Sequence, residues 1–97
     1  MATYIVLTNF TDQGIRSVKD STKRADAVKE MAKKFGVTAK EFLWTLGSYD
    51  LVGIFEAPDD ASMTALGLAI GSAGNVRTQT LRAFSREEMN GILAKLA

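Results

Sequence analysis

Neither cysteine nor histidine occurs in the 97 residues of the chain. Without cysteine there can be no disulfide, no thiolate metal ligand and no thiol nucleophile. Without histidine the chain lacks the commonest metal ligand and the commonest general base at neutral pH. We therefore expect no metal site and no cofactor.

An excess of charge of one sign is also missing. The 12 Lys and Arg residues are balanced by 11 Asp and Glu residues, and the formal net charge is +1. Proteins that bind nucleic acid need an excess of positive charge to hold the phosphate backbone. Nucleic acid is therefore not an expected partner.

Long hydrophobic runs are missing as well. The longest apolar segment, residues 65–70, is far shorter than the roughly 18 residues that span a bilayer. The first residues have no basic region and turn polar at Thr8, which is typical of a strand and not of a signal peptide. We predict a cytoplasmic protein without a membrane segment.

The composition that remains is ordinary for a globular protein, with 46% hydrophobic and 24% charged residues. A chain of this length suits one domain with its own core. We expect residues 1–97 to form a single domain.

An apolar hairpin at residues 40–57 is the element around which we expect the other elements to assemble. Two runs rich in Phe, Trp, Leu, Val and Ile meet at residues 47–50, Gly-Ser-Tyr-Asp, which is typical of an antiparallel hairpin. A turn centred on Ser48 and Tyr49 fixes which residues lie opposite one another. The expected pairs are Trp44 with Gly53, Phe42 with Phe55, and Glu41 with Glu56.

Both faces of this hairpin are largely apolar, and so are both faces of the strand expected at residues 4–10. A half-exposed sheet normally has one polar face, so we expect helices on one face and a second copy of the sheet on the other. We place Leu43, Val52 and Ile54 under the helices. We place Phe42, Trp44 and Phe55 toward the second copy.

The flanking segments predict helices and two further strands. Apolar residues at helical spacing predict a helix over 15–35 that ends at Gly36. A second helix over 60–73 carries almost no charge, so we expect it to be buried on more than one side, with Gly67 and Gly71 allowing close packing. Residues 76–84 are polar enough for an edge strand, and Ser85 with Glu88 forms a capping box before a terminal helix.

This order of elements predicts an α+β, ferredoxin-like βαββαβ fold. Its sheet has four antiparallel strands, and a helix is added at the C-terminal end. Both crossover helices then lie on one face of the sheet.

The chain also resembles the GYD domain family, a group of small bacterial proteins named for a Gly-x-Tyr-Asp element. That element is Gly47-Ser48-Tyr49-Asp50, and further stretches that carry the resemblance are residues 4–15, 56–60 and 74–84. The resemblance implies a ferredoxin-like domain of the dimeric α+β barrel type. It brings no established activity and no catalytic residue.

The candidate ligand-binding residues are Trp44, Tyr49, Asp50, Asn75 and Arg77. Tyr49 and Asp50 could supply a donor and a base, or Asp50 could cap the turn while Tyr49 packs on a neighbour. Asn75 suits the left-handed geometry after a helix end, and Trp44 suits the core or an interface.

Two interpretations of Arg77 stay open. Its guanidinium could hold a ligand carboxylate with two hydrogen bonds. Alternatively it could neutralise Glu41 or Glu56, which would repel each other if they were opposite.

We expect a homo-oligomeric small-molecule-binding or structural module whose sheets pack face to face, with itself as partner and a small apolar ligand between the sheets. The alternative is a cofactor-independent enzyme, monooxygenase- or isomerase-like, acting on a small aromatic or quinone-like compound in the sheet cavity. In that case the base would be Asp50, Glu41 or Glu56, with a pKa raised by burial.

Overall fold

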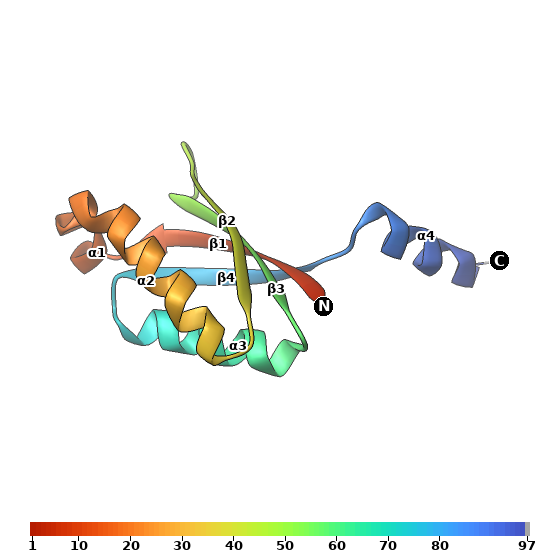
Figure 1. Ribbon diagram of the computed structural model, residues 1–97. Helices are drawn as coiled ribbons and strands as arrows, with labels where there is room; N and C mark the ends of the chain where they lie inside the picture. The colour runs from red at the N-terminus through yellow and green to blue at the C-terminus, as the bar shows by residue number, and fades with distance from the viewer. Residues whose placement is uncertain (97) are drawn as a thin grey trace.

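The computed structural model describes residues 1–96 and contains one four-stranded antiparallel sheet in the order β2-β3-β1-β4 (Figure 1). The strands are β1 Ala2–Phe10, β2 Thr38–Trp44, β3 Leu51–Ala57 and β4 Val76–Ala83. β4 lies at one edge, as predicted from its polar side chains.

Two crossover helices connect the strands on one face of this sheet. The helices are α1 Asp12–Arg16, α2 Ser21–Lys34, α3 Asp60–Ser72 and α4 Arg86–Leu93, with 3-10 turns at Val18–Asp20 and Ala94–Leu96. α2 and α3 are the crossovers, and α4 projects away from the sheet at the C-terminal end (Figure 1). The fold is therefore the predicted ferredoxin-like βαββαβ arrangement with an added helix.

The sequence signals for helix ends act as predicted. The Ser85 hydroxyl accepts a hydrogen bond from the amide of Glu88, whose carboxylate accepts one from the Ser85 amide, which completes the capping box of α4. Gly36 has a φ of 72° and ends α2 in the left-handed region.

The helix predicted over 15–35 is interrupted. Ser17 leaves helical geometry, with φ −113° and ψ 35°, and separates α1 from α2. The Arg24 guanidinium donates to the carbonyl oxygens of Ser17 at 2.9 Å and Gly14 at 3.1 Å. These carbonyls near the end of α1 are thereby satisfied without a further helical turn.

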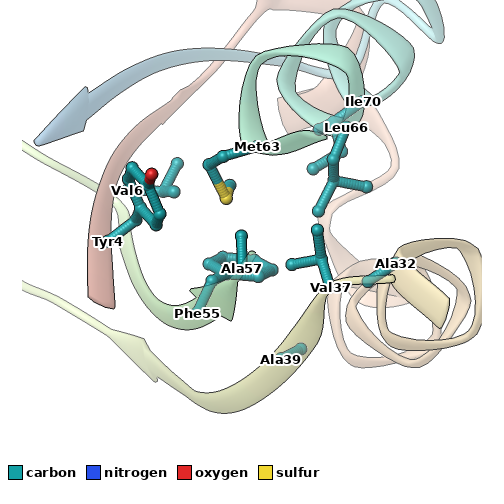
Figure 2. Close-up of a cluster of buried hydrophobic side chains, with 10 residues drawn as sticks. All are labelled: Tyr4, Val6, Ala32, Val37, Ala39, Phe55, Ala57, Met63, Leu66 and Ile70. Atoms are coloured by element: carbon teal, nitrogen blue, oxygen red, sulfur yellow. The ribbon is translucent and has the colours of Figure 1, made fainter. Parts of the chain in front are cut away.

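The core lies between the sheet and the two crossover helices (Figure 2). Phe55, which is 2% exposed, packs in a cluster with Met63 and Leu66 of α3 and with Val37. The face assignment made from the sequence is thus wrong: Phe42, Trp44 and Phe55 point toward the helices, and Leu43, Val52 and Ile54 point away from them. The alternation of side chains along the strands could not decide which face the helices cover, because both faces are apolar.

The hairpin register also differs from the prediction. Trp44 lies opposite Leu51 and Phe42 lies opposite Gly53, so the pairing is shifted by two residues. The cause is a longer loop, closed by a hydrogen bond from the Thr45 amide to the Asp50 carbonyl at 3.0 Å. Glu41 and Glu56 are therefore not opposite each other; their partners are Ile54 and Thr38.

α3 is covered on one side within this chain, and not on more than one as predicted. Met63, Leu66 and Ile70 are buried, whereas Leu68 is 71% exposed. A Cβ atom built on Gly67 or on Gly71 would meet no other atom within 4 Å. No element of residues 1–96 packs closely on this glycine face.

Candidate functional site

An apolar cavity of about 160 Å³ lies between α2 and the sheet. Its lining is mainly aliphatic and aromatic and comes from β1, α2, the hairpin, the end of α3 and the start of β4. Prominent members are Val6, Phe10, Val28, Met31, Phe42 and Phe55.

Gly53 shapes the sheet side of this cavity. A Cβ atom at this position would lie 2.6 Å from a ring carbon of Phe55. The missing side chain lets the rings of Phe42 and Phe55 meet edge to face, with centroids 5.8 Å apart.

Two buried polar residues line the cavity, Thr8 and Ser21. The Ser21 hydroxyl accepts a hydrogen bond of 2.7 Å from the Trp44 indole nitrogen. Trp44, one of the predicted site residues, is therefore fixed to the start of α2 next to the cavity and does not point toward a second copy.

Arg24 is the charged residue in the lining. Its guanidinium carbon lies 5.7 Å from the centroid of the Phe10 ring, and its nitrogen atoms bind the Ser17 and Gly14 carbonyls described above. The positively charged guanidinium of Arg24 thus stabilises the backbone between α1 and α2.

Asp50 connects the hairpin loop to the end of β1. Its carboxylate accepts a hydrogen bond of 2.9 Å from the Phe10 amide, and its own amide donates to the Thr8 carbonyl at 2.9 Å. This carboxylate binds backbone, as the capping alternative expected, but on β1 instead of its own turn.

Asn75 lies where the loop before β4 meets α1, and it lines the cavity. Its backbone carbonyl accepts from the backbone amide of Thr11 at 3.0 Å, and its side-chain oxygen accepts from Nε2 of the Gln13 side chain at 3.0 Å. The residue with left-handed geometry here is Gly74, with φ 83°. Asn75 does not share this geometry, since every residue with a positive φ among residues 1–96 is a glycine. The expectation that Asn75 takes this geometry is wrong.

Tyr49 and Arg77 lie away from the cavity. The Tyr49 hydroxyl donates to the Gln79 side chain at 3.3 Å, and Arg77 pairs with Asn9 on the sheet face opposite the helices. Arg77 does not neutralise Glu56: Glu56 pairs with Thr3 at the start of β1, whereas Asn9, the partner of Arg77, lies near the end of that strand, and the Glu56 carboxylate has Lys40 at 3.4 Å.

The sheet face away from the helices has two adjacent apolar rows. Ile5 lies between Ile54 and Leu81 across the strands, and in the next row Leu7 and Val52 lie beside each other. Leu43 extends the second row and is 47% exposed. We call these six side chains the bare sheet face.

The comparisons with known proteins agree with this geometry. The model of the GYD domain family matches residues 4–93. The chain belongs to the GYD domain family. A relative from Thermus thermophilus, named "Glutamine synthetase and cystathionine beta-lyase binding protein", is 37% identical over 84 residues, covering 86% of this chain and 88% of that protein.

A solved structure also resembles this GYD domain. The crystal structure of TTHA0845 from Thermus thermophilus has a TM-score of 0.57 and 26% sequence identity, and the match covers 88% of this chain and 95% of that one.

The Gly-x-Tyr-Asp element forms the hairpin loop of this GYD domain. Gly47 has a φ of 115°, which glycine adopts readily. The Tyr49 carbonyl accepts from the Thr45 hydroxyl, and Asp50 binds β1 as described. The element therefore positions the hairpin against the strand that lines the cavity.

A second, more polar groove of about 430 Å³ lies between α3 and β4 of the GYD domain. In it the Tyr4 hydroxyl donates a hydrogen bond to the Asp60 carboxylate. This hydrogen bond, together with burial, raises the pKa of Tyr4 above its ordinary value. The Arg82 guanidinium lies 5.8 Å from the centroid of the same ring.

Sequence reasoning missed Thr8, Ser21 and Arg24 as residues of the cavity. Arg24 lies in a run of charges that resembles a solvated helix face, and its contact with the carbonyls of α1 became visible only in three dimensions. Ser21 gave a weak signal, as a small polar residue at a helix start.

Acidic clusters and long apolar helices are both missing from the described part of the chain. In residues 1–96 no group of three or more Asp and Glu side chains could hold a metal ion. No described helix is long and apolar enough to cross a bilayer.

Proposed function

We propose that this GYD domain is a binding module that associates with a metabolic enzyme and that works as a homo-oligomer in the cytoplasm. The observation that carries the first part is the Thermus thermophilus relative, whose name assigns it the binding of glutamine synthetase and cystathionine beta-lyase. Identity of 37% over 86% of this chain makes an enzyme of this kind the partner to test first.

The bare sheet face supports the homo-oligomer. Complete burial of a fully exposed aliphatic side chain contributes about 1.5–3 kcal/mol, so Leu43 and Leu81, with 47% and 41% of their surface exposed, would each gain roughly half of this. A two-fold axis along the strands would place the six apolar side chains of one copy over those of the second copy.

Light scattering after size-exclusion chromatography tests the pairing of sheets. We expect a mass of at least two chains at low micromolar concentration, compared with 10.5 kDa for one chain. Ile54→Lys places a charge in the middle of the bare sheet face and should lower the mass to that of one chain. Thr22→Lys, on the exposed surface of α2, is the matched control and should leave it unchanged. A wild-type protein that is a single chain at this concentration contradicts the pairing.

The enzyme partner is tested by biolayer interferometry with immobilised protein and purified glutamine synthetase or cystathionine beta-lyase from the same organism. We expect saturable binding of at least one of them, with a Kd of about 10 µM or lower, and no binding of an unrelated enzyme of similar charge. If neither enzyme binds the wild-type oligomer, the proposed partner class is wrong, whatever the result for sheet pairing.

A cofactor-independent enzyme acting on a small aromatic or quinone-like compound is the second candidate, and the cavity favours it. However, the residues that line the cavity include no carboxylate and no tyrosine within residues 1–96. The expected bases do not line it: Asp50 binds the Phe10 amide, and Glu56 is paired with Lys40. A binding function therefore fits the geometry better.

A further inference from the structure

We propose that the cavity between α2 and the sheet binds a small uncharged aromatic molecule with at most one hydroxyl or keto group. This site lies within one chain, on the helix side of the sheet. It is thus separate from the space between paired sheets.

The volume sets the size of the ligand. Cavities of about 150 Å³ with walls of Leu, Ile and Phe stay dry when empty and hold a molecule such as benzene. The cavity here measures about 160 Å³. A single six-membered ring fits within this volume.

The walls set the polarity of the ligand. Phe10, Phe42 and Phe55 supply aromatic rings, and aliphatic side chains and Met31 supply most of the remainder. Arg24 is the charged side chain in the lining, and its guanidinium is bound to the carbonyls of Ser17 and Gly14. A charged ligand would lose its hydration without a free counter-charge, so an uncharged one is favoured.

Thr8 and its partner on β4, Thr78, both belong to the lining, and Thr8 is the buried one of this pair. It lines the cavity from the middle of the wall formed by β1 and is 4% exposed. Its hydroxyl can donate or accept one hydrogen bond, which suits a phenol or a ketone.

Access is available between α2 and the end of α3. Ala27 and Ala73 belong to the lining and are also exposed at the surface. Both side chains are small, so a ring-sized molecule can enter there without unfolding of the core.

Titration of the wild-type protein with benzene, phenol and benzoate tests the proposal, with binding followed by amide NMR shifts. We expect saturable binding of benzene and phenol with a Kd of about 1 mM or lower and at least tenfold weaker binding of benzoate. Absence of saturation with both benzene and phenol overturns the proposal, as does equal or tighter binding of benzoate.

Ala25→Leu adds three carbon atoms to a buried wall residue of α2 and should weaken the binding of benzene at least tenfold. Ala61→Leu, on the exposed side of α3, is the matched control and should bind as the wild type does. If Ala25→Leu folds and binds benzene unchanged, the ligand is elsewhere and the assignment is wrong.

Thr8→Val gives a second, independent result should Ala25→Leu fail to fold. Loss of one hydrogen bond should weaken phenol binding about fivefold and leave benzene binding unchanged. Equal changes for both ligands would refute the role of Thr8. Because all these measurements use the protein alone, their outcome is independent of whether an enzyme partner binds.

Discussion

Replacing Gly14 by alanine tests the junction between α1 and the loop before β4, which closes one end of the cavity. Gly14 is buried, and a Cβ atom there would lie 1.9 Å from the Asn75 carbonyl oxygen. An ordinary contact needs at least 3.4 Å. The Asn75 backbone would therefore have to retreat by roughly 1.5 Å.

The cost of this movement follows from the hydrogen bonds that it breaks. The Asn75 carbonyl accepts from the Thr11 amide at 3.0 Å, and the adjacent Gly74 carbonyl accepts from the Thr11 hydroxyl at 2.6 Å. Each is worth about 1 kcal/mol, and overpacking adds about 1–3 kcal/mol. The better helix propensity of alanine returns about 1 kcal/mol. We expect a net loss of about 3 kcal/mol in the free energy of unfolding.

Urea denaturation followed by circular dichroism measures this loss, and thermal unfolding should show a Tm that is lower by roughly 12–24 °C. Gly67→Ala is the matched control. It also places alanine in a helix, but its Cβ atom meets nothing within 4 Å, so it should stabilise the protein by about 0.5–1 kcal/mol.

A Gly14→Ala variant with wild-type stability, within about 0.5 kcal/mol, would refute the reasoning, because it would mean that the Asn75 carbonyl moves without loss. If instead Gly67→Ala destabilises the protein, the glycine face of α3 is covered by another molecule in solution.

Two further predictions concern pH. The hydrogen bond to Asp60 raises the pKa of Tyr4. The stability that this hydrogen bond contributes is complete below the unfolded-state pKa of about 10 and is lost as pH rises toward the folded-state value. Tyr4→Phe should therefore flatten the fall of the unfolding free energy above about pH 10. The hydrogen bond from the Ser62 amide lowers the pKa of Asp59, the N-cap of α3. The stability that this cap contributes is complete above about pH 3.9 and is lost as pH falls through the folded-state value. Asp59→Asn should reduce the acid dependence, and an unchanged pH profile in urea titrations of either variant would contradict its assignment.

The order of elements could be predicted because each carries a local signal. The capping box of Ser85 and Glu88, the glycine at 36 and the acidic residues after Pro58 all mark helix ends whose hydrogen bonds join neighbouring residues. The polar side chains of β4 indicated its edge position. Such signals act over a few residues, so no tertiary information is needed to interpret them.

The predicted hairpin register was wrong because the loop is held by contacts that the alternating pattern does not encode. The loop geometry depends on Thr45 bonding the Tyr49 and Asp50 carbonyls, and on the Asp50 carboxylate reaching the Phe10 amide, 40 positions away in the chain. An alternating strand fits either register equally well, since a shift of two keeps every side chain on its face.

The amino-acid sequence by itself determined the family, the fold class and the surplus of apolar surface on both sides of the sheet. Only the tertiary structure decided which side the helices cover, because side chains alternate along a strand in the same way whichever face is buried. It also decided where the cavity lies. Thr8, Ser21, Phe42 and Gly53 belong to four separate segments, and only the packing of α2 over the sheet makes them neighbours.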